Sequence, residues 1–166
     1  GEMVSFDDAH DDLAKFAEAA GAAVMTAYRR QDCFPNDHPA YAGHLEINRL
    51  PYQRQALADA DLMIAVGSRM DGITSEDGAL PYAHQPLIQI YPDGDVLANC
   101  QPYLSILSDA KNACLNLAGR LRPGSTAWCD GLNEAHGQSI KPGAVNVHGT
   151  VDLARISASL HELAPA

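Results

Sequence analysis

The chain has 166 residues, enough for one domain with a substantial hydrophobic core, and a second complete domain is not expected. Its 21 acidic and 11 basic side chains give a formal net charge of -10, which disfavours a surface for nucleic acid or anionic membranes. The longest apolar runs are far shorter than the roughly 20 residues of a membrane-spanning helix. No export leader opens the chain, so we expect a cytoplasmic protein.

The first predicted element is a helix that begins near Ser5 and ends at Gly21. The Ser5 hydroxyl is suited to accept a hydrogen bond from a free amide of the first turn. Glycine at position 21 is a common helix end because it readily adopts a left-handed conformation. Apolar residues recur at helical spacing between these two points, at Ala9, Leu13, Phe16, Ala17 and Ala20. The pattern predicts a surface helix with one buried face.

Three segments follow with different patterns. The apolar run 22–27 contains Thr26 near its end and predicts a short buried strand. The proline-rich segment 34–43 has no clear period and predicts a long loop. Pro51 fits the first position of a second helix, because proline needs no hydrogen-bond partner there.

The run 62–66 is continuously apolar and leads directly into Gly67, Ser68 and Arg69, with Asp71 two residues later. Such a run is typical of a strand covered by helices on both faces of a parallel sheet. Ligands of these sheets bind beyond the carboxyl ends of the strands, so the four residues are candidates for ligand contact. The alternative is that Arg69 is a surface arginine paired with Asp71.

Two further strands are predicted at 86–91 and 103–107, followed by a helix at 110–121. Ser108 is a suitable N-cap for this helix, with Asp109 in its first turn. Strand and helix therefore alternate from the N-terminus onward. This alternation predicts a doubly wound α/β domain.

After residue 123 the composition changes. Residues 124–147 are rich in glycine, serine, asparagine and proline and predict an interdomain connection. A last amphipathic helix is carried by Val151, Leu153, Ile156, Leu160 and Leu163. Its apolar face needs a partner, which is either this domain or a domain that the chain does not contain.

Four segments in the same order and spacing resemble the central domain of thiamine diphosphate enzymes of the acetolactate synthase family. They are Phe-Pro-x-Asp-His-Pro-x-Tyr-x-Gly at 34–43, Ala-Asp-Leu-x-x-x-Val-Gly-Ser-Arg-x-Asp at 60–71, Ile-x-Ile at 88–90 and Ser-Asp-Ala-Lys at 108–111. The tail 140–165 resembles the linker and first helix of that family's C-terminal domain.

The resemblance implies a Rossmann-like α/β/α domain with a parallel sheet at 1–123, a linker at 124–147 and the first helix of a C-terminal domain at 148–166. It also implies a parent enzyme that uses thiamine diphosphate and magnesium to decarboxylate 2-oxo acids, with both bound by domains outside this chain. We therefore expect an inactive fragment with no catalytic residue and no metal ligand. Its partners would be the remaining domains of the parent enzyme.

By the same resemblance, the positions that contact FAD in some relatives are Thr26, Gly67, Ser68, Arg69, Asp71, Asp109 and Ala110. Other relatives hold ADP or no nucleotide at this place. Glu46 stands where the flavin enzymes have glycine, Ile73 where they have a second arginine, and Tyr91 where they have an acid. An added carboxylate and a lost cation both disfavour a pyrophosphate, so FAD is a weaker expectation than ADP or an empty site. The alternative function is a stand-alone module that binds FAD or an adenine nucleotide without catalysis.

The family's first strand would come just before Gly1, at the centre of the sheet. Without it, two strands are expected to have unpaired edges. We therefore expect a homo-oligomer or a swapped element.

Overall fold

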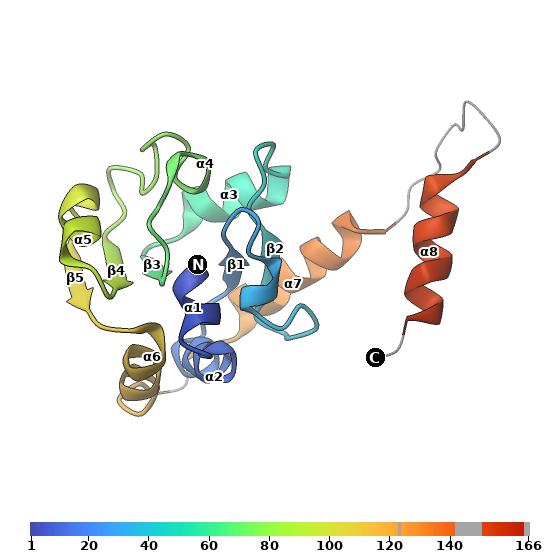
Figure 1. Cartoon of the computed structure of the whole chain (residues 1–166). Coiled ribbons are helices and arrows are strands. Elements are labelled where there is room, and N and C mark those ends of the chain that lie inside the picture. Colours follow the sequence, from blue (N-terminus) through green and yellow to red (C-terminus); the bar gives the residue numbers. More distant parts are fainter. Residues whose placement is uncertain (123, 142–150, 165–166) are drawn as a thin grey trace. The chain divides into compact units, whose positions relative to one another are not determined.

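The computed structural model describes residues 1–122, 124–141 and 151–164 (Figure 1). The chain divides into two compact units, Gly1–His136 and Gly137–Ala166. The first unit alternates parallel strands with helices, which confirms the predicted Rossmann-like α/β fold. No helix within the described ranges is long and apolar enough to cross a membrane.

The elements in chain order are α1 (Glu2–Phe6), α2 (His10–Ala20), β1 (Val24–Thr26), the 3-10 helix η1 (Gln31–Cys33), β2 (Tyr41–His44), α3 (Pro51–Asp59), β3 (Met63–Val66), α4 (Gly72–Ser75), β4 (Leu87–Tyr91), α5 (Gly94–Cys100), β5 (Leu104–Leu107), α6 (Ala110–Ala118), α7 (Ala127–Ser139) and α8 (Leu153–Leu163).

The strands form two parallel sheets rather than one. β1 pairs with β2, and β3, β4 and β5 pair in that order. Among the described strands, β1 and β3 are therefore each paired along one edge only, as expected for a sheet that lacks a central strand. Helices α2 and α6 pack together and cover the core, in which Val4, Phe16, Ile90 and Cys114 are almost completely buried.

The predicted first helix is in fact two helices, and the prediction of Ser5 as N-cap was wrong. Ser5 lies inside α1, where its hydroxyl donates to Asp32 Oδ2 at 3.0 Å. The N-cap of α2 is Ala9, whose side chain cannot accept a hydrogen bond. Gly21 ends α2 with φ of 61°, as predicted.

Two elements lie where the sequence predicted irregular structure. β2 occupies the end of the predicted loop 34–43, and its first three residues are buried. α5 follows the turn at Pro92, and Asp93 caps it by accepting a hydrogen bond from the Asp95 amide at 2.8 Å. Short elements with one or two turns carry too little periodicity to be detected.

Helix α7 was also not predicted, because 124–147 has no clear period. Cys129 on this helix is buried, and Asn133 Nδ2 donates to the Tyr41 carbonyl of β2 at 2.9 Å. Tyr52 Oη lies 3.1 Å from His136 Nδ1. Burial, and then the charge of His44, lower the pKa of His136.

In the second unit, α8 is the predicted amphipathic helix. The Asp152 carboxylate caps it by accepting from the Arg155 amide at 3.1 Å. Its apolar residues Leu153 and Leu163 are exposed. Residues 142–150 of the predicted linker and following segment lie outside the described residues, so the division at 123, 147 and 148 stays a prediction.

Candidate functional site

Helix α1 occupies the space beyond the carboxyl end of β3, where a ligand was expected. The Met3 amide donates to Gly67 O at 3.1 Å, and the Gly1 nitrogen donates to Val66 O at 2.8 Å. Gly67 is buried with φ of 60°, and an added Cβ there would lie 2.8 Å from Met3 Cβ. Glycine is therefore required at position 67 by the close approach of α1 and by its own backbone conformation.

Arg69 forms an ion pair with Glu2 of α1. Its Nε lies 2.7 Å from Glu2 Oε1, and the Tyr91 hydroxyl donates to the same oxygen at 3.1 Å. Arg69 is 62% exposed and Glu2 is 12% exposed. Burial, and then the hydrogen bond to Glu2, raise the pKa of Tyr91. The alternative, a surface arginine paired with Asp71, was right about the exposure of Arg69 but wrong about its partner. The sequence carried no signal for Glu2, because the two partners are far apart in the chain.

Ser68 and Asp71 bond to the backbone of their own turn. The Ser68 hydroxyl accepts from the Met70 amide at 3.2 Å, and Ser68 is buried. Asp71 is the N-cap of α4 and accepts from the Thr74 amide at 2.8 Å. Both side chains therefore stabilise the turn that follows β3.

The start of α6 is held in the same manner, and the prediction of Ser108 as its N-cap was wrong. Asp109 is the N-cap and accepts from the Asn112 amide and side chain, both at 2.8 Å. These hydrogen bonds lower the pKa of Asp109. The Ala110 amide donates to Asp7 Oδ2 at 2.7 Å, which ties α6 to the turn after α1.

The remaining candidate, Thr26, is buried at the end of β1. Of the residues that departed from the flavin pattern, Glu46 is exposed and lies 2.9 Å from His44 Nε2, and Ile73 is exposed. The structure thus distributes the seven candidates over the ends of β1 and β3 and the start of α6. Whether they contact a nucleotide stays a prediction.

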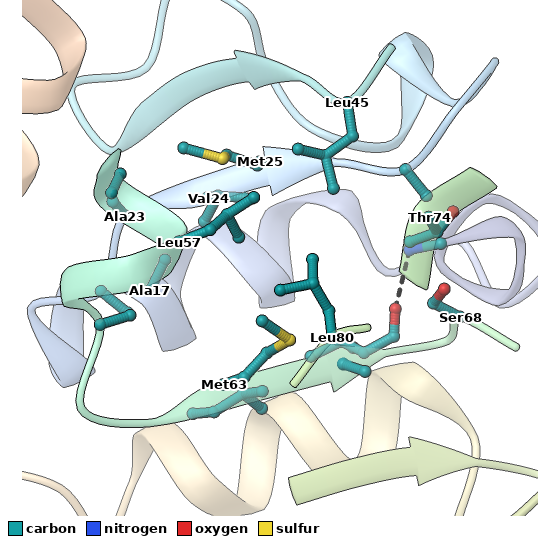
Figure 2. Close-up of a pocket in the computed structure, with 18 of the residues that line it drawn as sticks. Ala17, Ala23, Val24, Met25, Leu45, Leu57, Met63, Ser68, Thr74 and Leu80 are labelled. Carbon is teal, nitrogen blue, oxygen red and sulfur yellow. Dashed lines mark hydrogen bonds between the residues drawn. The ribbon is translucent and has the colours of Figure 1, made fainter. Parts of the chain in front are cut away.

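A hollow with a volume of about 210 Å³ lies near these residues and is lined by side chains of β1 and β3. Figure 2 shows Met25, Leu57, Met63 and Leu80 around it. Only a few polar side chains, such as Thr74, contribute to its wall. An apolar hollow without a cation is unsuited to a pyrophosphate.

Arg49 connects the loop before α3 to α4. Its Nη2 donates to the carbonyls of Ile73 at 3.1 Å and Thr74 at 2.6 Å. Its Nη1 lies 3.0 Å from Glu76 Oε1, and the Arg49 side chain is 1% exposed. Burial lowers the pKa of Arg49. This arginine therefore serves the fold and is not available to a ligand.

Metal and thiol chemistry have little support in the described part of the chain. No group of three or more histidine, cysteine or acidic side chains is arranged there to hold a metal ion. The four cysteines are free thiols. Burial raises the pKa of Cys114 to about 12, so this thiol is protonated near neutral pH.

The family to which the chain belongs is evident from its similarity to known proteins. The family model described as "Thiamine pyrophosphate enzyme, central domain" matches residues 1–117. A sulfoacetaldehyde acetyltransferase of Alcaligenes xylosoxydans xylosoxydans is 34% identical over 145 residues, which are 84% of this chain and 24% of the relative. A probable acetolactate synthase large subunit of Methanocaldococcus jannaschii is 27% identical over 122 residues, 73% of this chain and 21% of the relative.

A solved structure has the same fold over nearly the whole chain. The thiamine diphosphate-dependent 4-hydroxybenzoylformate decarboxylase of Rhodococcus jostii RHA1 superposes with a TM-score of 0.69 at 23% identity. The match covers 99% of this chain and 30% of that protein. The chain thus spans about a quarter of the length of the curated relatives it matches. The chain belongs to the thiamine pyrophosphate enzyme family, and residues 1–117 match the central domain of that family.

Proposed function

We propose that this chain is the scaffolding, non-catalytic central domain of a larger thiamine diphosphate-dependent enzyme that decarboxylates 2-oxo acids. The family membership and the similarity to a probable acetolactate synthase support the proposal. In this proposal thiamine diphosphate supplies the electron sink for decarboxylation, and it is held with magnesium by domains outside this chain. The polar residues at the ends of β3 and the start of α6 do not fit the binding of thiamine diphosphate or magnesium, because they already cap helices or form ion pairs within the chain.

The single observation that carries the scaffolding role is the exposed apolar surface of β5. Tyr103, just before β5, is 84% exposed, and Leu104 and Leu107 are 46% and 68% exposed. β5 is at the edge of its sheet, so its outer backbone groups are also open to a partner. Exposed apolar side chains on an edge strand are typical of a surface that contacts another domain or subunit.

The proposal includes an oligomer that forms through the β5 surface. Substitutions that introduce a charge into this surface test it. Leu107→Glu places a carboxylate in the β5 surface, whereas Ala79→Glu adds the same charge at an exposed loop position outside β5. Light scattering after size exclusion is expected to give an oligomer for the parent chain and Ala79→Glu, and a monomer for Leu107→Glu. An unchanged mass for Leu107→Glu would reject β5 as the contact.

The non-catalytic part of the proposal has its own test. The chain supplied with thiamine diphosphate, magnesium and pyruvate is expected to release carbon dioxide no faster than the solution without protein. Turnover above that background would show that the catalytic groups lie within these 166 residues and would reject the proposal.

The alternative of a nucleotide-binding module is less well supported. Arg69 is the cation that a pyrophosphate would need, and it already pairs with Glu2. The space above Gly67 is filled by Met3. FAD or ADP would have to displace α1 to reach these groups.

A further inference from the structure

The outer edge of β5 carries a row of backbone groups without partners. The Ser108 amide donates to Tyr91 O, so the backbone groups of Ser108 point toward β4. Because successive residues of a parallel strand bond to opposite sides, the amides and carbonyls of Ser105 and Leu107 point away from β4. None of these groups has a hydrogen bond within residues 1–122, 124–141 and 151–164. The free row lies at the open edge of the sheet β3-β4-β5 (Figure 1).

The side chains of this row lie on one exposed face. Tyr103, Ser105 and Leu107 share a face because side chains alternate along a strand. Ser105 is in register with Gln89 of β4, and α5 covers β4 on that face, where Cys100 Sγ lies 3.5 Å from Gln89 Nε2. Helix α5 does not extend this cover to the edge, since Tyr103, Ser105 and Leu107 are all exposed.

The edge also lacks the charges that usually protect an unpaired strand. No charged residue lies between Asp95 and Asp109, whereas edge strands that stay single commonly carry lysine or another charge. The chain has a formal net charge of -10, and two copies with this charge repel each other. The β5 edge therefore offers a second copy an approach without opposed carboxylates.

The row is complementary to itself about Ser105. When two β5 strands are placed antiparallel with Ser105 opposite Ser105, Tyr103 of each copy lies opposite Leu107 of the other. Each of these opposed residues directs its amide and carbonyl outward, which is the requirement for a hydrogen-bonded antiparallel pair. The same register places Asp109 opposite Gln101, so carboxylates do not meet.

The opposite face of β5 fits the same register. Leu104 is 46% exposed, and Ile106 packs against the core. In the antiparallel pair Leu104 lies opposite Ile106 of the second copy, which places an apolar side chain beside each of them. A strand from another domain would need no symmetry about Ser105. The symmetric pattern therefore favours a second copy as the partner, since a two-fold contact uses the same surface on both subunits.

We propose that β5 pairs antiparallel with β5 of a second copy of this chain, with Ser105 at the two-fold axis. Strands β3, β4 and β5 of both copies would then form one continuous sheet. The pairing rests on the β5 contact of the proposed function and adds the partner, the strand direction and the register.

Cysteine cross-linking tests the register. All variants carry Cys100→Ser, because Cys100 is the one of the four thiols that is not buried. In the proposed pair the two copies of residue 105 have Cα atoms about 5.5 Å apart, within the range of a disulfide. The two copies of residue 107 are about 14 Å apart, because they are offset by four residues along the strands. Oxidation with copper phenanthroline is expected to give at least about fivefold more disulfide-linked dimer for Ser105→Cys than for the exposed control Leu107→Cys.

A mixture of two chains tests the strand direction. Tyr103→Cys and Leu107→Cys are expected to give no more cross-linked dimer alone than Cys100→Ser does. Mixed in equal amounts, they are expected to form a disulfide-linked dimer with one chain of each kind, which mass spectrometry identifies. Because the mixture leaves Ser105 unchanged, it is independent of the folding of Ser105→Cys.

Two results would overturn the pairing. One is equal cross-linking of Ser105→Cys and Leu107→Cys, and the other is a mixture that gives no more dimer than its two chains alone. The β5 contact itself is judged by the mass of Leu107→Glu. An oligomer that dissociates on Leu107→Glu substitution but shows neither cross-link would keep the β5 contact of the proposed function and overturn only the antiparallel pairing.

Discussion

Substitution of Arg49 by methionine tests how the loop before α3 is held against α4. The change keeps a long, apolar side chain and removes the guanidinium. In the parent chain this group donates to the carbonyls of Ile73 and Thr74 and lies 3.0 Å from a carboxylate oxygen of Glu76. Arg49→Met leaves the two carbonyls without this donor and Glu76 without its nearest cation.

The expected loss of stability follows from these contacts. A hydrogen bond that involves a charged group contributes about 1.5–3 kcal/mol, and breaking a buried ion pair costs about 3–5 kcal/mol. Removing the guanidinium also relieves the cost of burying it, so the two hydrogen bonds and the ion pair do not simply add. We expect Arg49→Met to lower the free energy of unfolding by about 3 kcal/mol, which corresponds to a fall in Tm of about 6–12 °C.

Urea denaturation followed by circular dichroism measures the change. Glu76→Gln is the comparison, because it removes the counter-charge but leaves the two carbonyl hydrogen bonds of Arg49 in place. The Arg49 side chain is 1% exposed and would keep its charge without a carboxylate partner, so this substitution is expected to cost about 1–2 kcal/mol, less than Arg49→Met. Arg49→Lys keeps the charge but cannot reach both carbonyls and Glu76 together, so it is expected to fall in between. A loss below about 1 kcal/mol for Arg49→Met, or an equal loss for both substitutions, would refute this reasoning.

Three further outcomes are expected. At pH 8 iodoacetamide should modify the partly exposed Cys100 and leave Cys114 unmodified until the chain is unfolded. The reason is that burial raises the pKa of Cys114 to about 12. Mass spectrometry of the native chain after the reaction measures which thiols are modified. The pKa of His136 is lowered in the folded chain, so its contribution to stability is complete above the unfolded pKa of about 6.5 and is lost as the pH falls through the lower folded value. His136→Gln should therefore make the free energy of unfolding less pH-dependent below pH 6.5. An unaltered pH profile would exclude His136 as a source of this dependence. Asp109→Ala should lower the free energy of unfolding by about 0.5–2 kcal/mol above pH 4, through loss of the α6 cap. The pKa of Asp109 is lowered in the folded chain, so the difference between the two chains should disappear as the pH falls through that lowered value. A difference in stability that persists at lower pH would contradict the charge-based explanation.

The sequence predicted the elements whose apolar patterns are long or uninterrupted. The run 62–66 contains β3, the run 86–91 contains β4, and the stripe after Asp109 is α6. These segments are recognisable because their side chains alone determine where they can be buried. Two strands with unpaired edges were also expected from the family resemblance, without a prediction of which strands these would be.

The capping residues and the short elements were harder to predict. Ser5 and Ser108 are good caps by composition, but the helices begin one turn away or one residue later. A cap depends on backbone geometry that neighbours impose, whereas composition reports only preference. Helix α7 was missed because its buried residues, such as Cys129, are few and its contacts come from distant β2.

The carboxyl end of β3 was located correctly in the sequence, but its occupation by α1 was not foreseen. Gly67, Ser68, Arg69 and Asp71 do lie at the carboxyl end of β3. The pairing of Arg69 with Glu2 joins residues 67 positions apart, and no local pattern signals it. Contacts of this kind become visible only once the chain is folded.

Calorimetric titration of the chain with FAD and with ADP tests most directly whether the carboxyl edge of β3 is a scaffold closed by α1. We predict no heat of binding for either nucleotide at ligand concentrations up to about 1 mM, a range that detects even weak sites. Saturable heat that disappears on Arg69→Ala substitution would contradict this account, because Arg69 would then be available to a phosphate despite its contact with Glu2.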